Sequence, residues 1–409
     1  MDVHPKPSSD PATHCEIRSV GIIGAGAMGR GIAAANVNAG IRVFIADVND
    51  NAAAAAIEEI LWSSPTSNND APIAVAVTSD EQFADVDLVI EAVAEDEAIK
   101  TTVLSRIEPY LRPDTFLTSN SSSIPMTRLA TCLKIPERFC GLHFCYPVDK
   151  RPLVEVVGTD VTNASTLAEI HSYATYIGMA PIAVRDAPGF LLNRLLVPYL
   201  NEALELVLNQ ADIRTIDATA MSFGFPTGPL MQLDEFGMDV ALEVGKTLYQ
   251  SFPDRIFPSE LLIAMFKARR FGRKTGRGFY FDDGVRSDNI VPDVEEIVRR
   301  RLRNTAPVAD AEIERRLFLP MLLEATRTLE NSLVNRAAIV DKALQDGLGM
   351  TDCYTGLFSW ADAIGASTIV DWLRPLQSLG NRFEPTSILL DVASRKGAKL
   401  ADWEQTSLR

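Results

Sequence analysis

Val20-Gly-Ile-Ile-Gly-Ala-Gly-Ala-Met-Gly29 is the stretch that decides the fold of this chain. The apolar residues before Gly24 predict a buried parallel strand, and the Ala, Ile and Val residues after Gly29 predict a helix that ends before Gly40. Between them, three glycines follow the spacing G-x-G-x-x-G. A strand, a glycine turn and a helix in this order are typical of a site where N–H groups at the helix N-terminus bind phosphate groups.

An acidic residue follows the next predicted strand. The strand 42–46 ends at Asp47, where a carboxylate can accept hydrogen bonds from both ribose hydroxyls. A 2′-phosphate would be repelled there, and Val48 follows rather than an arginine. The sequence therefore predicts a dinucleotide site that prefers NAD over NADP, with these candidate cofactor-binding residues: Gly24, Gly26, Ala27, Met28, Gly29 and Asp47.

The composition is that of an ordinary soluble protein with two or three domains. The chain has 409 residues, 47% of them hydrophobic, and a formal net charge of −15, which argues against nucleic acid as a partner. No apolar run reaches the ~18 residues that a membrane span needs. Five scattered cysteines favour a reducing compartment, so we expect a cytoplasmic protein. Cys140, His143 and Cys145 are spaced as in a strand rather than a zinc site, and no metal is expected.

Strands and helices alternate in the first part of the chain. After a polar segment that predicts a disordered tail over 1–17, the pattern predicts an α/β fold, with a Rossmann-type doubly wound sheet over 18–186. Ligands bind such sheets at the carboxyl ends of the strands. The predicted strands are 19–23, 42–46, 73–77, 87–93, 115–119, 139–144 and 153–157, with helices over 52–62 and 96–111.

The rest of the chain is predicted to be helical and to contain a repeat. Residues 193–203 align with 315–325, and 227–237 align with 355–365, in the same order. This predicts two repeated all-α domains, 187–283 and 284–409, that arose by duplication.

A histidine and a carboxylate are the best candidates for proton transfer. His143 ends an apolar strand, and Glu155 is a charge within the apolar Leu-Val-Glu-Val-Val. If their strands are adjacent, Glu155 would orient the imidazole as a general base. The alternative is a structural Glu155 paired with Arg194 or Lys150, and an unrelated core histidine.

Three further polar features have two interpretations each. The hydroxyl cluster Ser119-Asn-Ser-Ser-Ser123 is either a functional loop or a helix cap. Asn193 is either a site residue or a polar residue within a helix. The basic, glycine-rich stretch 271–280 is either a solvated loop or an anion-binding one.

Taken together, these motifs resemble the L-3-hydroxyacyl-CoA dehydrogenase family over residues 18–282. The region after 290 resembles the last domain of the multifunctional β-oxidation enzymes, whose enoyl-CoA hydratase half has no counterpart here. The motifs that carry the resemblance are the glycine turn with Asp47, Asp87-Leu-Val-Ile-Glu-Ala-Val, Ser119-Asn-Ser-Ser-Ser, Gly141-Leu-His-Phe, Pro152-Leu-Val-Glu-Val, Asp186-Ala-Pro-Gly-Phe-Leu-Leu-Asn-Arg, Gly224-Phe-Pro-Thr-Gly-Pro and Gly272-Arg-Lys-Thr-Gly-Arg-Gly-Phe-Tyr.

The resemblance implies NAD-dependent oxidation of an L-3-hydroxyacyl-CoA to a 3-ketoacyl-CoA. His143 corresponds to the general base and Glu155 to its carboxylate partner, while Ser122 and Asn193 correspond to groups that hold the reacting oxygens. Further positions that match the family's NAD site are Glu95, Lys100 and Lys274.

The resemblance also bears on the second repeat. It has Arg315 where the first has Asn193, so we expect it to be non-catalytic. In the family a single helical domain forms a dimer. The duplicate would fill that surface from within the chain, so we expect a pseudo-dimeric monomer, with a homodimer as the alternative.

The chain departs from the family in two places. Tyr146 replaces an asparagine that lies beside the nicotinamide, and no Lys or Arg occurs between Val43 and Ile99, where the family has basic residues that meet CoA. Two alternatives therefore stay open. One is a dehydrogenase of a free or carrier-protein-bound 3-hydroxy acid. The other is a degenerate NAD-binding regulatory protein.

Overall fold

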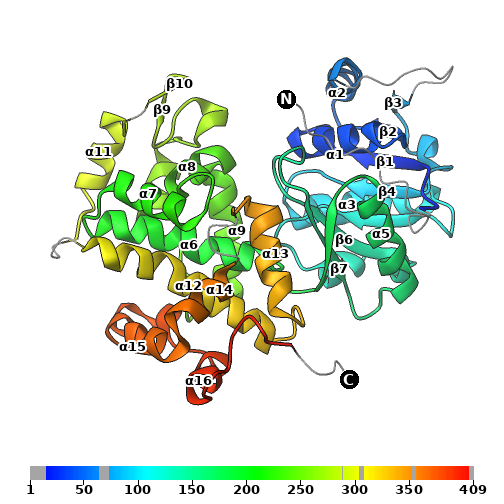
Figure 1. Ribbon diagram of the computed structural model, residues 1–409. Helices are drawn as coiled ribbons and strands as arrows, with labels where there is room; N and C mark the ends of the chain where they lie inside the picture. Colours follow the sequence, from blue (N-terminus) through cyan, green and yellow to red (C-terminus); the bar gives the residue numbers. More distant parts are fainter. Residues whose placement is uncertain (1–14, 64–72, 288, 304–307, 352–355, 405–409) are drawn as a thin grey trace. The chain divides into compact units, whose positions relative to one another are not determined.

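The chain forms two compact units, Met1–Phe190 and Leu191–Arg409 (Figure 1). The computed structural model describes residues 15–63, 73–287, 289–303, 308–351 and 356–404. Within these ranges, every helix is too short or too polar to cross a membrane.

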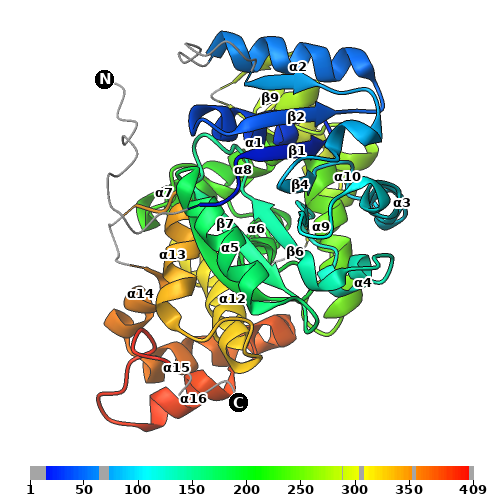
Figure 2. The ribbon, with the colours of Figure 1, turned by 90° about the vertical axis from the view of Figure 1, so that its right-hand side faces the viewer.

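The first unit is built on one eight-stranded sheet with the order β3-β2-β1-β4-β5-β6-β7-β8. All neighbouring strands are parallel except β6 and β7, and β1 lies between β2 and β4 (Figure 2). The predicted α/β doubly wound fold is confirmed. Because the chain reverses direction along the sheet at β1, the turns after β1 and β4 meet at a topological switch point. The strands are β1 (Ser19–Ile23), β2 (Arg42–Ala46), β3 (Ala74–Ala76), β4 (Leu88–Glu91), β5 (Phe116–Ser119), β6 (Phe139–Phe144), β7 (Leu153–Gly158) and β8 (Ala180–Arg185).

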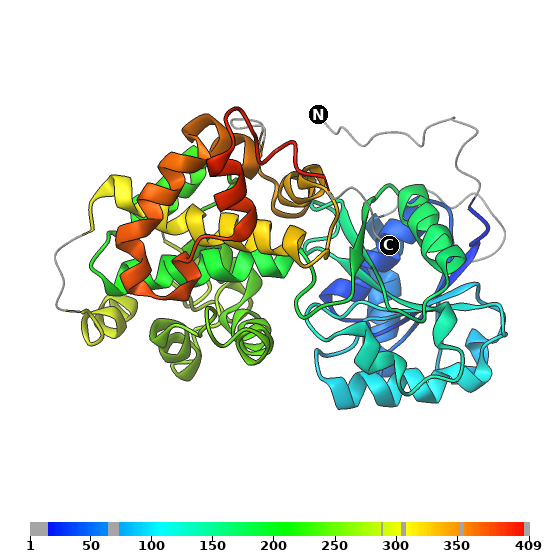
Figure 3. The ribbon, with the colours of Figure 1, turned by 90° about the horizontal axis from the view of Figure 1, so that it is seen from below.

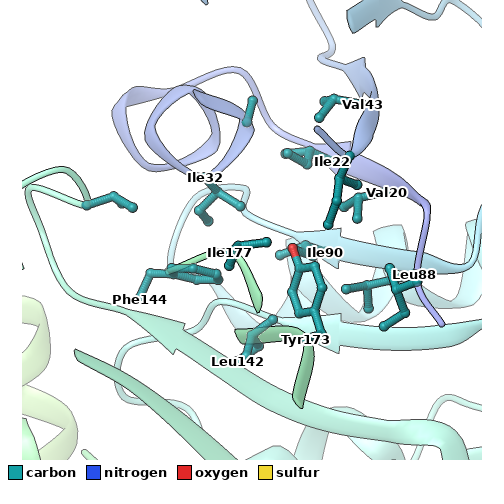
Figure 4. Close-up of a cluster of buried hydrophobic side chains, with 14 of the residues drawn as sticks. Val20, Ile22, Ile32, Val43, Leu88, Ile90, Leu142, Phe144, Tyr173 and Ile177 are labelled. Atoms are coloured by element: carbon teal, nitrogen blue, oxygen red, sulfur yellow. The ribbon is translucent and has the colours of Figure 1, made fainter. Parts of the chain in front are cut away.

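Helices cover both faces of this sheet. On one face, alternate strand residues such as Ile22 and Leu142 pack against Ile32 of α1 and Tyr173 of α5 (Figure 4). On the other face, a Cβ at Gly141 would lie 2.9 Å from the Met126 side chain of α4. The helices of this unit are α1 (Ala27–Asn38), α2 (Asp50–Ser63), α3 (Glu97–Ile107), α4 (Met126–Ala130) and α5 (Ala164–Tyr176), with 3-10 helices η1 (Asp80–Phe83), η2 (Glu108–Tyr110) and η3 (Pro136–Arg138).

Two features of the first unit differ from the sequence prediction. Strand β8, which contains Pro181, was not predicted; the proline is tolerated because β8 is the edge strand and pairs only with β7. Cys15 and Ile17, placed by the sequence in the tail, are buried in the core that α1 and α5 cover. The remainder of the predicted tail, 1–14, lies outside the described residues.

The second unit is helical apart from a small hairpin, β9 (Phe281–Asp282) and β10 (Val285–Arg286). Its two longest helices, α6 and α12, lie side by side (Figure 3). The helices are α6 (Leu192–Leu208), α7 (Ile213–Phe223), α8 (Pro229–Phe236), α9 (Met238–Ser251), α10 (Glu260–Lys267), α11 (Pro292–Arg299), α12 (Asp310–Glu330), α13 (Ala337–Leu348), α14 (Leu357–Ile364), α15 (Ala366–Leu376) and α16 (Ser387–Ser394), with 3-10 helices η4 (Arg273–Thr275), η5 (Gln377–Leu379) and η6 (Asn381–Phe383).

Matching sequence segments form matching structures in this unit. Asp234 in α8 accepts hydrogen bonds from two consecutive backbone N–H groups, those of Phe279 and Tyr280. Its counterpart Asp362 in α14 accepts from the consecutive N–H groups of Leu400 and Ala401. Gly237 and Gly365, which end α8 and α14, have φ of 99° and 94°, a conformation that favours glycine. Each repeat therefore uses the same turn and the same carboxylate anchor.

Candidate active site

The three glycines of the first turn have different physical roles. Gly24 has φ of 114°, and a Cβ there would lie 2.4 Å from the carbonyl oxygen of Ala92 at the end of β4. A Cβ at Gly29 would lie 1.8 Å from the carbonyl oxygen of Gly24, so only glycine lets α1 approach the turn. In contrast, nothing lies within 4 Å of a Cβ built on Gly26. The backbone at Gly26 thus faces open space at the N-terminus of α1, where a pyrophosphate would bind.

Asp47 ties the second strand to this turn. Its Oδ2 accepts a hydrogen bond from the N–H of Ala25 at 2.7 Å, and its Oδ1 accepts from the N–H of Asn49 at 3.0 Å. The carboxylate is half-buried beside the glycine turn. The sequence-predicted residues from Gly24 to Gly29 and Asp47 are therefore brought together at one end of the sheet.

His143 and Glu155 form a buried pair. They are register partners in the antiparallel pairing of β6 with β7, and the imidazole Nδ1 lies 2.6 Å from Glu155 Oε2. The ring of Phe190 lies 5.8 Å from the imidazole, centroid to centroid. The predicted contact between His143 and Glu155 is confirmed by this geometry, and the alternative partner Arg194 pairs elsewhere, with Glu324.

A carboxylate supports the serine loop that follows β5. Glu95 Oε1 accepts hydrogen bonds from the N–H groups of Ser122 and Ser123, both at 2.8 Å, and from the hydroxyls of Ser121 and Ser123. Burial would raise the pKa of Glu95, but Lys100 and these hydrogen bonds outweigh it and hold the pKa below its usual value. An ionised Glu95 therefore fixes the backbone of Ser122.

Lys100 lies beneath the same loop and is 1% exposed. Its Nζ is 2.8 Å from Glu91 Oε1 and 3.4 Å from Glu95 Oε2. The other oxygen of Glu91 accepts a hydrogen bond from the hydroxyl of Ser119 at 2.5 Å. Glu91 was not singled out in the sequence, although a carboxylate in an otherwise apolar strand is a signal that could have identified it.

A second residue that the sequence analysis missed is Asn120. Its side-chain oxygen accepts a hydrogen bond from the N–H of Phe144 at 2.9 Å, and the side chain is buried. This bond joins the serine loop to the residue after His143. The Asn120 side chain thereby links the serine loop to the strand that carries His143.

Two predicted site residues belong to the second unit. Asn193 is the second residue of α6 and is half-buried. Lys274 lies in η4, with its Nζ 2.6 Å from Asp239 Oδ2. Their roles toward substrate and cofactor stay predictions, as do those of Ser122, Glu95 and Lys100.

Tyr146, the departure from the family pattern, lies just beyond β6. Its side chain is 44% exposed, whereas the preceding Cys145 is buried. A phenol is larger than an asparagine side chain and lacks its amide donors and carbonyl acceptor. The side chain at position 146 therefore offers different hydrogen-bonding groups from those of the usual sequence.

Comparison with known protein families agrees with these features. Residues 19–187 match the model of the 3-hydroxyacyl-CoA dehydrogenase NAD-binding domain, and residues 189–282 match the model of the C-terminal domain of the same proteins. The chain belongs to the 3-hydroxyacyl-CoA dehydrogenase family. Members of this family are oxidoreductases, and the match of the first domain identifies NAD as the cofactor. The glycine turn, with open space at Gly26 and a carboxylate at Asp47, fits that cofactor.

Solved structures of 3-hydroxyacyl-CoA dehydrogenases are also similar to this chain. The (S)-3-hydroxybutyryl-CoA dehydrogenase PaaH1 from Ralstonia eutropha is 35% identical and has a TM-score of 0.60; the match covers 65% of this chain and 99% of that chain. The 3-hydroxybutyryl-CoA dehydrogenase from Escherichia coli K12 is 24% identical, with 93% of this chain and 98% of that chain covered and a TM-score of 0.76.

A third similar structure is the dehydrogenase part of multifunctional enzyme 1 from C. elegans. It is 24% identical, with 92% of this chain and 89% of that chain covered and a TM-score of 0.63. At 24% identity, the structures from C. elegans and Escherichia coli show that this chain shares their fold. That fold extends beyond residue 282 into the second helical repeat.

Proposed function

We propose that this protein oxidises an L-3-hydroxyacyl-CoA to the 3-ketoacyl-CoA, with NAD as the hydride acceptor. Family membership supports the reaction class. The observation that carries the proposal is the buried contact of His143 Nδ1 with Glu155 Oε2 at 2.6 Å. A strand-end histidine held by a carboxylate is the general base that removal of a hydroxyl proton requires.

The two nitrogens of His143 then have separate tasks. With Nδ1–H donating to Glu155, Nε2 carries the lone pair and takes the proton of the substrate 3-hydroxyl. NAD, when bound, accepts the hydride that leaves C3 as the C–O bond becomes a carbonyl. Glu155 stabilises the imidazolium that forms, and in the reverse direction the imidazolium returns the proton to the oxygen.

Ser122 and Asn193 hold the reacting oxygens in this proposal. The hydrogen bond from the N–H of Ser122 to Glu95 sets the backbone of the serine loop, so Glu95 acts as a positioning residue. Lys100 neutralises Glu91 and Glu95 below that loop. Because Lys100 is buried, its part is to hold Glu95 in place rather than to bind phosphate directly.

A second candidate is a dehydrogenase of a free or carrier-bound 3-hydroxy acid. It is favoured by the absence of Lys and Arg between Val43 and Ile99. Without a basic residue there, the CoA nucleotide lacks an ion pair that would stabilise binding by about 1.5–3 kcal/mol, the value of a charged hydrogen bond. In the described part of that segment, α2 carries the acidic residues Asp50, Glu58 and Glu59.

The test is NADH formation from 3-hydroxyacyl thioesters of CoA, from C4 to C16, beside the pantetheine thioester, a carrier-protein thioester and free 3-hydroxybutyrate. We expect turnover on the CoA thioesters. Turnover on the free acid or carrier thioester alone would move the protein to the second candidate. NAD binding without turnover on any form would indicate the regulatory alternative.

A further inference from the structure

Helices α6 and α12, which contain the aligned segments of the two repeats, are joined by two buried ion pairs, in each of which an arginine of one helix binds a glutamate of the other. Arg194 of α6 donates through Nε to Glu324 of α12 at 2.9 Å. Arg316 of α12 donates through Nε to Glu202 of α6 at 2.7 Å. In the alignment of the repeats, Arg194 corresponds to Arg316 and Glu202 corresponds to Glu324. The two pairs are therefore equivalent contacts of an antiparallel helix pair.

Each carboxylate also accepts a hydrogen bond from a second arginine. Arg255 Nε donates to Glu324 at 2.6 Å, and Arg382 Nε donates to Glu202 at 2.7 Å. Glu324 also accepts from Arg327 at 3.0 Å. Burial would raise the pKa of Glu324, but the three guanidinium groups outweigh it and hold that pKa below its usual value.

The residue that precedes the arginine differs between the two ion pairs. Arg194 follows Asn193, the residue proposed to hold a reacting oxygen. Arg316 follows Arg315, whose guanidinium stacks on the ring of Trp372 at 4.2 Å. The ion pair of Arg194 thus lies next to a proposed site residue, whereas the equivalent ion pair of Arg316 lies next to a residue that stacks on a tryptophan.

We infer that Glu324, from the second repeat, is a positioning residue for Asn193, an inference that rests on the proposed function. Asn193 and Arg194 lie in the first turn of α6. Arg194 is 2% exposed and is held by Glu324 on one side and by the ring of Phe252, at 4.3 Å, on another. Glu324 thereby sets the position of this turn. The second repeat, which has Arg315 in place of Asn193, thus helps to position the proposed site residue of the first repeat.

The matched test compares Glu324→Gln with Glu202→Gln. Both remove one buried carboxylate from the same helix pair, so both should lower the thermal midpoint. Only Glu324→Gln should lower kcat, by about 10-fold to 100-fold, as expected for a slightly misplaced site group. The Kd for NAD and the kcat of Glu202→Gln should stay within about twofold of the wild type. Equal kcat losses in both variants, or no loss in either, would overturn the inference.

A milder pair covers the case in which Glu324→Gln does not fold. Arg194→Lys and Arg316→Lys keep the charge but lose the planar guanidinium. We expect a lowered kcat in Arg194→Lys alone.

Hydrogen exchange of the first turn of α6, measured without substrate, separates this inference from the proposed function. Faster exchange there in Glu324→Gln, but not in Glu202→Gln, supports the positioning role even if the wild-type protein lacks turnover on every thioester. Unchanged exchange overturns it.

Discussion

His143 and Glu155 show how much a single residue depends on its neighbour across a sheet. Changing His143 to Gln keeps the size and polarity of the side chain but removes the base. We expect turnover to fall about 10²-fold to 10⁴-fold, the usual contribution of a general base. NAD affinity, measured by fluorescence titration, should stay near the wild-type value because the glycine turn is formed by other strands. Loss of NAD binding would contradict this assignment.

Asp217 offers a prediction about pH at the same scale. Burial raises its pKa to about 6, although it accepts hydrogen bonds from the hydroxyl of Tyr280 and the N–H of Leu230. The folded protein thus binds a proton more readily than the unfolded chain, so the contribution of Asp217 to the free energy of unfolding falls as pH rises from about 4 to about 6.

Asp217→Asn removes that titration. From urea denaturation, the free energy of unfolding of the variant minus that of the wild type should be about 2 kcal/mol higher at pH ~7.5 than at pH ~4.5, so the variant is relatively more stable at the higher pH. An Asn variant with the same difference from the wild type at both pH values would contradict the raised pKa.

At the scale of elements, two glycines of the turn between β1 and α1 have different roles, one in folding and one in NAD binding. Gly29→Ala places a methyl 1.8 Å from the Gly24 carbonyl oxygen and should destabilise the first unit. Gly26→Ala meets nothing within 4 Å, at φ of −68°, so the thermal midpoint should change little. NAD binding should nevertheless weaken at least about 10-fold, because the methyl occupies the space that the pyrophosphate needs. A Gly26→Ala protein that binds NAD as tightly as the wild type would refute this placement of the cofactor.

At the scale of the whole molecule, the second repeat covers α6 from within the same chain. The reciprocal pairs of Arg194 with Glu324 and Arg316 with Glu202 are already buried in one polypeptide. We therefore expect a monomer, with a mass near 44.7 kDa by light scattering at micromolar concentration. Twice that mass, with crosslinks between copies at two full interfaces, would contradict a pseudo-dimeric monomer and favour the homodimer.

Local sequence by itself determined the elements and the cofactor turn. Alternating apolar strands and helices predicted the sheet, and the prediction of 139–144 coincides with β6. The glycine spacing and Asp47 predicted the NAD site, because the turn conformation and the helix N-terminus depend on residues close together in the chain. The missed strand β8 contains Pro181, which only its place at the sheet edge makes acceptable.

The tertiary structure decided which distant residues meet. The sequence left Glu155 with three possible partners, and the antiparallel register of β6 and β7 selected His143. Arg194 instead meets Glu324, 130 residues away. Local periodicity carries no information about such contacts, because they follow from the order of strands in the sheet and the packing of helices. A buried charge predicts that a partner exists, and only the fold supplies that partner.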